Sequence, residues 1–355
     1  MTFVKTLTVA SVAAGSLVLA TAGVAQARDQ INIVGSSTVF PFATAVAEQF
    51  GNKTEFKAPK VESTGSGGGL KLFCKGVGAE TPDVTNASRR MKAKEYKLCQ
   101  DGGVKDIVEF KLGFDGIAIA NAQSGPAMAL TRKQVYLALA KEVPDPAGGE
   151  KVVANPYQTW ADVDPSLPNM KIEVLGPPPT SGTRDAFEEL AIEGGCKSFG
   201  FLKAMKKADK KRYRQICRHI REDGAYVEAG ENDNLIVSKL EANPKAVGVF
   251  GYSFLEQNAD KVKGATIDGV APEFEAISSG DYPVSRSLWM YVKKAHIGVI
   301  PGLQEYTQEW VANGTFGEEG YLVEKGLIPL PKGERETTVA KATSLATMDG
   351  SEKLK

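Results

Sequence analysis

One short pattern occurs three times in this chain: a strand, a loop of serine, threonine and glycine residues, and then a helix. The pattern is predicted at residues 31–50, 60–74 and 172–190. Strands that alternate with helices are typical of α/β folds with a mostly parallel sheet. In such folds the loops that follow the strands converge beyond one edge of the sheet, and ligands bind there.

The third occurrence, GPPPTSGTRDAFEEL at residues 176–190, is the clearest. Its proline run cannot continue a helix, and Thr180 or Ser181 can cap the helix that follows. Backbone N–H groups at a helix start are free to bind an anion. Ser181 and Thr183 would add hydroxyl donors, and Arg184 would add a permanent positive charge. A capped helix start without any ligand is the alternative interpretation of each loop taken alone.

Residues 1–27 have the features of a cleaved signal peptide. Lys5 is followed by the apolar segment Leu7–Ala22, and Ala25-Gln26-Ala27 matches a cleavage site of the A-x-A type. The apolar run is short for a membrane span, and no cysteine follows it to carry a lipid. We therefore expect a mature protein that begins at Arg28 and is free in the bacterial periplasm.

The remaining chain, about 330 residues, is long enough for two domains of ordinary size. Lysine and arginine number 43, aspartate and glutamate also 43, and the sequence pI is about 6.8. This balance argues against nucleic acid or a membrane surface as the main partner. The basic segment 203–221 is expected to be the solvated face of a helix, with an acidic partner protein as the alternative.

Four cysteines lie in the predicted exported chain, and an even number in an oxidising compartment favours two disulfides. Three pairings are possible, and the pairing of neighbours in sequence, Cys74–Cys99 and Cys196–Cys217, is the one we favour. A metal site is not expected, because the chain has no C-x-x-C motif and only two histidines, His219 and His296. Both histidines are expected at the surface.

Motifs of catalysis are missing from the sequence. It contains no G-x-S-x-G motif and no phosphate-binding P-loop, and two histidines leave little material for a Ser-His-Asp triad. Neutral loop donors combined with one or two arginines fit the binding of an oxyanion instead. We therefore expect a binding protein that is not an enzyme and has no cofactor.

The sequence resembles the periplasmic phosphate-binding proteins of phosphate ABC transporters, the PstS family. The motifs that carry the resemblance are spread over most of the chain in the family's order: residues 35–41 (GSSTVFP), 65–68 (GSGG), 83–89 (DVTNASR), 114–118 (FDGIA), 181–184 (SGTR), 248–254 (GVFGYSF) and 282–286 (YPVSR).

The resemblance implies an α/β fold of type II solute-binding proteins, with two lobes joined by two crossover strands and a ligand cleft between the lobes. Lobe I would comprise residues 28–117 and 281–355, and lobe II residues 118–280. It also implies capture of inorganic phosphate for delivery to a membrane permease and its ATPase, by a monomer that binds no nucleic acid.

The resemblance further implies a phosphate site built from the three loops and their neighbours. It places Thr38, Val39, Ser66, Ser181, Gly182 and Thr183 against the anion, and our candidate set adds Ser37, Ser88, Arg89, Asp115 and Arg184.

The chain departs from a well-known form of the family at two positions. Arg89 stands where that form has an acidic residue, and Pro177 stands where it has an arginine. Arg89 or Arg184 would then supply the positive charge, and another carboxylate would accept the proton of hydrogen phosphate. Our first candidate for this acceptor is Asp115 and our second is Asp185. A turn residue in an Asp-Gly pair is the alternative role of Asp115.

Other functions fit the same motifs. The ligand could be another oxyanion, such as sulfate, arsenate, phosphite or a phosphorylated metabolite. A secreted phosphatase-like enzyme could use Ser37 or Ser181 as its nucleophile, although no base lies nearby in the sequence. A sensor or adhesion protein could dock through the basic segment 203–221.

Overall fold

The computed structural model describes residues 1–2, 28–179, 181–230, 233–352 and 354. The predicted signal peptide lies almost entirely outside these residues, and so does Thr180. Within the described ranges, no helix is long and apolar enough to cross a membrane.

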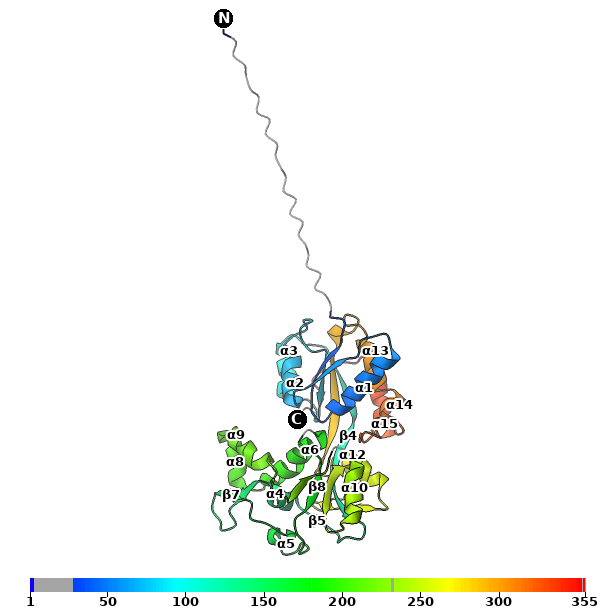
Figure 1. The fold of residues 1–355 in the computed structure, drawn as a ribbon. Helices are drawn as coiled ribbons and strands as arrows, with labels where there is room; N and C mark the ends of the chain where they lie inside the picture. Colours follow the sequence, from blue (N-terminus) through cyan, green and yellow to red (C-terminus); the bar gives the residue numbers. More distant parts are fainter. Residues whose placement is uncertain (3–27, 180, 231–232, 353, 355) are drawn as a thin grey trace.

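The strands form two sheet regions, one in each lobe (Figure 1). In lobe I, β1 pairs in parallel with β2 and β3, and β13 runs antiparallel between β3 and β4. In lobe II, β8 pairs in parallel with β9 and β10, and β10 and β11 run antiparallel to β4. The sheets are therefore mixed rather than mostly parallel. The strands span β1 Asn32–Gly35, β2 Lys60–Ser63, β3 Val84–Ala87, β4 Ile107–Ala122, β8 Val174–Gly176, β9 Tyr226–Glu228, β10 Val247–Gly251, β11 Val262–Gly264 and β13 Ser285–Lys293.

Two further strand pairs lie at the periphery: β5 Ala129–Leu130 with β12 Thr266–Ile267, and β6 Glu142–Pro144 with β7 Val152–Ala154. Helices cover the sheets of both lobes. Those of lobe I are α1 Phe40–Lys53, α2 Ser66–Phe73, α3 Ala93–Asp101, α13 Leu303–Trp310, α14 Asn313–Phe316 and α15 Lys332–Ser344, with the 3-10 helix η2 Lys294–His296. Those of lobe II are α4 Arg132–Leu139, α5 Trp160–Val163, α6 Gly182–Phe187, α7 Glu193–Cys196, α8 Gly200–Ala208, α9 Lys210–Arg218, α10 Asp233–Ala242, α11 Tyr252–Gln257 and α12 Phe274–Ser279, with the π-helix η1 Glu188–Ile192.

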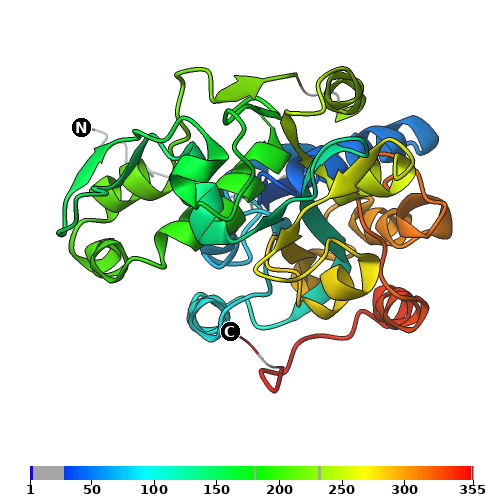
Figure 2. The ribbon, with the colours of Figure 1, turned by 90° about the horizontal axis from the view of Figure 1, so that it is seen from below.

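The C-terminal segment returns to the lobe in which the chain begins. Helices α1, α13 and α15 lie side by side in Figure 2, and α13 contacts both of the others. The aromatic rings of Phe50 in α1 and Tyr306 in α13 pack edge to face, 5.6 Å apart. Lobe I is thus built from both ends of the described chain.

Strand β4 belongs to both lobes. Its first part, Ile107–Gly116, pairs with β13 of lobe I, and Ile117–Ala120 pairs with β10 of lobe II. The strand is 16 residues long, and every residue in it except Lys111 is buried. A second connection runs alongside it, because the N–H of Ile117 donates to Val284 O at 2.9 Å. The two lobes are therefore joined by two extended segments that are hydrogen-bonded to each other.

The three predicted strand–loop–helix units are present. They are β1 with α1, β2 with α2, and β8 with α6.

Glycines let the first two units pack closely. Gly35 has a φ of +134°, and a Cβ there would lie 2.1 Å from Asn86 O. A Cβ at Gly69 would lie 2.5 Å from the Cα of Gly35, so α2 rests directly against β1.

Three local expectations differ from the structure. Asp115-Gly116 is not a turn, because β4 continues through both residues. The basic segment 203–221 forms two helices rather than one, and Asp209 begins the second by accepting the N–H of Arg212. His296 is buried rather than exposed. Its ring nitrogen Nδ1 forms a hydrogen bond with the carboxylate of Asp83, which is also fully buried.

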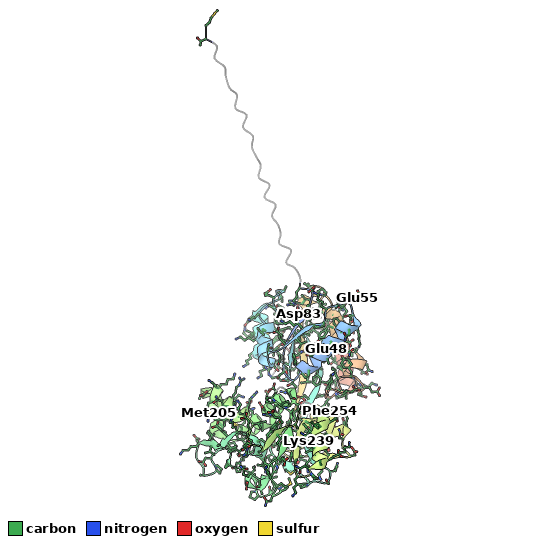
Figure 3. The ribbon with its side chains drawn as sticks, in the orientation of Figure 1. Glu48, Glu55, Asp83, Met205, Lys239 and Phe254 are labelled. Atoms are coloured by element: carbon green, nitrogen blue, oxygen red, sulfur yellow. A yellow bond between two sulfur atoms is a disulfide. The ribbon has the colours of Figure 1, made fainter. Side chains whose placement is uncertain are left out.

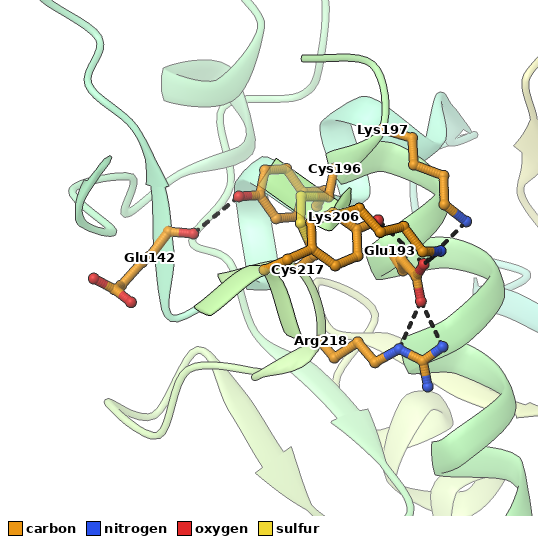
Figure 4. The surroundings of a disulfide bond; sticks show 9 residues. Glu142, Glu193, Cys196, Lys197, Lys206, Cys217 and Arg218 are labelled. Carbon is orange, nitrogen blue, oxygen red and sulfur yellow. Dashed lines mark hydrogen bonds and ion pairs between the residues drawn. A yellow bond between two sulfur atoms is a disulfide. The ribbon is translucent and has the colours of Figure 1, made fainter. Parts of the chain in front are cut away.

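Both disulfides join the cysteine pairs favoured by the sequence, Cys74–Cys99 and Cys196–Cys217. The first ties α2 to α3 in lobe I. The second ties α7 to α9 in lobe II, where Glu193 gathers several cations (Figure 4). Glu193 accepts hydrogen bonds from Lys206 at 2.6 Å, from Arg218 at 2.6 Å and from Tyr213 at 3.1 Å. Burial would raise the pKa of Glu193, but these partners outweigh it and lower the pKa to about 2.

We predict that replacing Cys196 and Cys217 together by serine lowers the free energy of unfolding by about 3 kcal/mol. The reason is that the disulfide closes a loop with a sequence separation of 21 residues, and its loss frees the unfolded chain. Denaturant unfolding of the oxidised proteins measures this difference. The wild-type protein under reducing conditions is the control, and an unchanged unfolding midpoint in both would contradict the prediction.

Candidate functional site

The first and third loops meet between the lobes. A Cβ at Gly182, in the third loop, would lie 3.1 Å from Ser37 O and 3.3 Å from the Cα of Thr38, both in the first loop. Because Gly182 has no side chain, the backbones of the two lobes approach each other at this point. The structure thus brings together the predicted site residues of the first and third loops.

The first loop is held by a residue that the sequence analysis did not select. Ser36 is buried, and its Oγ accepts the N–H of Thr38 at 3.2 Å and the N–H of Val39 at 3.4 Å. These N–H groups open α1, which has no side-chain cap from Val39 itself. Ser36 therefore aligns two backbone donors at the positive end of a 14-residue helix.

The second loop contributes a group of hydroxyls and an arginine. Ser66 Oγ lies 3.2 Å from Ser88 Oγ and accepts the Ser88 N–H at 3.0 Å. The neighbouring Arg89 is fixed by Glu95, to which it donates two hydrogen bonds, at 2.7 and 2.8 Å. Glu95 also accepts the N–H of Lys92 at 2.9 Å, so one carboxylate orients both the arginine and the start of α3.

Arg286 joins the two lobes at the centre of the site. Its guanidinium donates to Thr38 Oγ1 in the first loop, to Asp115 at 3.2 Å and to Glu189 of lobe II at 3.3 Å. Arg286 and Asp115 are direct cross-strand neighbours on β13 and β4. The positive charge beside the first loop therefore comes from Arg286, and neither Arg89 nor Arg184 takes this position.

Asp115 is a buried carboxylate at the junction of the lobes, with 7% of its surface exposed. Burial raises its pKa, and the charge and hydrogen bond of Arg286 oppose that shift. Asp185, the second candidate acceptor, is exposed in α6. Of the two carboxylates, Asp115 alone lies beside Thr38 and Arg286.

Arg184 is buried beneath the third loop. Its Nε donates to Glu188 at 2.7 Å, its Nη1 donates to Pro177 O at 3.3 Å, and its guanidinium lies 4.4 Å above the ring of Tyr226. Ser181 caps α6 by accepting the Thr183 N–H at 3.2 Å. Arg184 thus holds the loop in place from the side of lobe II.

A cavity of about 990 Å³ opens between the lobes next to these groups. Ser66, Ser88, Arg89, Glu189 and Arg286 line it. The other predicted residues do not line this cavity: Ser37, Thr38, Val39, Asp115, Ser181, Gly182, Thr183 and Arg184. Among the described residues, no group of histidine, cysteine, aspartate and glutamate is placed to hold a metal ion.

The sequence analysis missed Ser36, Glu189 and Arg286 as members of the site. Arg286 belongs to one of the motifs that carry the family resemblance, residues 282–286, and this was a usable signal. Ser36 lies in another such motif, residues 35–41. Glu189 has no comparable signal, because it lies in an ordinary-looking helical stretch and only the packing of the lobes brings it to Arg286.

Comparison with known proteins gives a consistent result. A family model for the PBP superfamily domain matches residues 20–313. The phosphate-binding protein PstS of Staphylococcus epidermidis is 32% identical over 267 residues, which cover 73% of this chain and 67% of that protein. Protein SphX of Synechocystis sp. is 28% identical over 314 residues, covering 86% of this chain and 80% of the relative.

Solved structures share the fold. A possible phosphate binding protein from Planctomyces limnophilus matches with a TM-score of 0.68 and 28% identity, covering 89% of this chain and 98% of the other. An ABC-type phosphate transport receptor from Vibrio cholerae matches in fold with a TM-score of 0.55 and 21% identity, covering 85% and 100% of the two chains.

These matches confirm the resemblance and the two-lobed α/β fold predicted from the sequence. The PstS relative and the Planctomyces limnophilus structure are named as binding proteins, in agreement with the prediction that the chain is not an enzyme. The chain belongs to the PBP superfamily and, within it, to the PstS family of phosphate-binding proteins.

Proposed function

We propose that this chain is the substrate-binding component of an ABC importer and captures inorganic phosphate between its two lobes. The observation that carries the proposal is the cluster of Thr38, Asp115 and Arg286 where the lobes meet. It combines a hydroxyl and a buried carboxylate that each hydrogen-bond to the same guanidinium. A permanent cation and a proton acceptor side by side suit an anion that itself carries a proton.

The carboxylate provides a basis for selectivity. Hydrogen phosphate has an O–H group that needs an acceptor, whereas sulfate at neutral pH has none. An ionised Asp115 would accept this proton, but it would face sulfate with no hydrogen between two negative charges. Phosphate is therefore the oxyanion that this arrangement fits best.

The remaining donors surround the same region. The hydroxyls of Ser37, Ser66, Ser88, Ser181 and Thr183 and the N–H of Gly182 would complete the set around the anion. The N–H groups of Thr38 and Val39 would join them by exchanging Ser36 Oγ for the anion. Arg89, held by Glu95 at the cavity wall, would add charge from lobe I. We assign Arg184 a positioning role, because its guanidinium is engaged by Glu188 and Pro177 O.

The wider assignments are part of the proposal. We place lobe I at residues 28–117 and 281–355 and lobe II at residues 118–280, with hinges near the two segments that pair at Ile117 and Val284. The protein would act as a periplasmic monomer after cleavage of residues 1–27, and it would deliver phosphate to a permease and its ATPase.

The direct test is calorimetric titration of the mature protein after bound ligand has been removed by unfolding and refolding. We expect one-to-one binding of phosphate that persists in a large excess of sulfate. Loss of binding in sulfate would indicate a general oxyanion site. No heat with phosphate would contradict the proposed function.

Replacing Asp115 by asparagine should weaken phosphate binding and strengthen sulfate binding. The ratio of the two affinities should fall by about 10- to 100-fold, the range expected for one hydrogen bond to a charged group. The amide can donate to sulfate but presents no negative charge. Competition titrations of phosphate against sulfate measure the change. The control is Asp185→Asn, in the exposed carboxylate of α6. Equal effects of the two variants would contradict the role of Asp115.

Sulfate binding should depend on the protonation state of Asp115. The pKa of Asp115 is raised, so the neutral carboxyl forms as the pH falls through that raised value and persists below it. We expect wild-type sulfate binding to strengthen as the pH falls, since the protonated carboxyl can donate to sulfate. In Asp115→Asn this pH dependence should be missing.

Replacing Arg286 by lysine should weaken phosphate binding by about tenfold or more. Lysine keeps the charge, but its ammonium is compact and cannot reproduce the planar fork that reaches Thr38, Asp115 and Glu189 together. Calorimetry measures the change, with Arg335→Lys, a largely buried arginine of α15 paired with Glu318, as the control. Unchanged affinity in Arg286→Lys would remove Arg286 from the site.

A further inference from the structure

The cavity between the lobes is larger than orthophosphate requires. Its volume of about 990 Å³ lies at the upper end of the range of pockets that hold drug-sized ligands, about 300–1,000 Å³, whereas orthophosphate has only five non-hydrogen atoms. The residues assigned to orthophosphate lie where β4 and β13 join the lobes. The cavity extends from there to the outer helices α8 and α9, which lie across the gap from α2 and α3 (Figure 1).

The outer part of this cavity is strongly cationic on both sides. Arg89 and Lys92 line it from lobe I, and Lys206, Lys210 and Arg214 line it from lobe II. The label of Met205 in Figure 3 marks α8, the helix that also carries Lys206. Nine lysines and arginines line the whole cavity, and six of them pair with carboxylates: Arg89 with Glu95, Arg90 with Glu109, Lys111 with Glu334, Lys206 and Arg218 with Glu193, and Arg286 with Asp115.

Carboxylates neutralise only part of this charge. Glu193 is shared by three cations, Lys197, Lys206 and Arg218. The side chains of Lys92, Lys210 and Arg214 form no ion pair with any residue in the described part of the chain. Lys210 and Arg214 are also exposed, so they are available to an incoming anion.

Cations line both walls of the cavity. The pKa of Lys92 is lowered, mainly by the charge of Arg89 and then by burial, and Lys206 on the opposite lobe contributes in the same direction. Closure of the lobes would bring these like charges closer together. An anion placed between the walls would offset this effect. Of the residues assigned to orthophosphate, Ser66, Ser88, Arg89 and Arg286 line the cavity, whereas Thr38 and Asp115 contact Arg286 but do not line it.

A linear anion with several phosphoryl groups would span both regions. Its first phosphoryl group would occupy the orthophosphate position, and the next would lie between Lys92 and the pair Lys210 and Arg214. Ammonium and guanidinium groups form charge-assisted hydrogen bonds with phosphoryl oxygens. A phosphate monoester fits less well, because its uncharged half would leave the outer cations without a partner.

We propose that the outer cleft is a second phosphoryl subsite and that the protein also binds linear condensed phosphates, namely pyrophosphate and tripolyphosphate. This inference rests on the proposed function, since the inner subsite is the orthophosphate site described above. Lys210 and Arg214 are the residues that distinguish the two classes of ligand, because they line the outer subsite and lie apart from the inner one.

The test compares two charge-reversed proteins with the wild type. One carries Lys210→Glu and Arg214→Glu. The control carries Lys203→Glu in α8 and Lys211→Glu in α9, the helix that holds Lys210 and Arg214. Both control residues are exposed and do not line the cavity. Each mature protein is stripped of ligand and titrated by calorimetry with orthophosphate, pyrophosphate, tripolyphosphate and glycerol 3-phosphate, in metal-free buffer at physiological ionic strength.

We expect wild-type protein to bind tripolyphosphate one-to-one in competition with orthophosphate. Lys210→Glu with Arg214→Glu should lower the affinity for tripolyphosphate by at least about tenfold and change the affinity for orthophosphate by no more than about twofold. The control should change neither affinity by more than about twofold. Equal loss of affinity for orthophosphate and tripolyphosphate would overturn the subsite and indicate a nonspecific electrostatic attraction. Equal effects of the two charge-reversed proteins would do the same. Orthophosphate binding without tripolyphosphate binding would also overturn it.

Tighter binding of glycerol 3-phosphate than of pyrophosphate would overturn the assignment to condensed phosphates. Failure of the proposed function has a different signature. Tripolyphosphate binding that depends on Lys210 and Arg214, without any orthophosphate binding, would support the subsite and overturn orthophosphate capture. Absence of binding for all four anions would overturn both.

Discussion

The pairing of strand β4 with both sheets is the constraint on which the rest of the structure depends. Ile107–Gly116 hydrogen-bonds within lobe I, and the next residues do so within lobe II. Since the strand is buried along almost its whole length, neither lobe can be displaced from it without exposing apolar surface and unpaired backbone groups. The return segment at Val284 pairs with the same strand, so movement between the lobes is confined to bending about these two segments.

This geometry explains why the polar cluster lies where it does. Asp115 is carried into the junction by β4, and Arg286 is placed opposite it by the register of β13. A buried carboxylate is destabilising unless it has a charged or hydrogen-bonding partner. Arg286 supplies that partner and at the same time reaches the first loop and Glu189. A single guanidinium therefore compensates the buried carboxylate and links the two lobes.

The cations of lobe II depend on a second arrangement. The disulfide Cys196–Cys217 fixes α7 against α9, and this brings Glu193 next to Arg218 and Tyr213 (Figure 4). Glu193 has only 2% of its surface exposed and is held ionised by its cationic partners, which together lower its pKa to about 2. The basic helices α8 and α9 are thus anchored on their inner side, while Lys210 and Arg214 face the cleft without a carboxylate partner in the described structure.

The sequence by itself determined the local elements: the three strand–loop–helix units, the cysteine pairing and the family. These follow from short-range properties, such as the proline at the start of α1, the glycines of the loops and the order of the motifs. The tertiary structure alone decided which charged groups meet. Asp115-Gly116 looks like a turn in sequence but continues a strand, and His296 looks exposed but is buried against Asp83. Arg89 or Arg184 was expected to supply the positive charge, and the sequence did not indicate that Arg286 would contact Thr38 and Asp115. Strand register and lobe packing bring these residues together from distant parts of the chain.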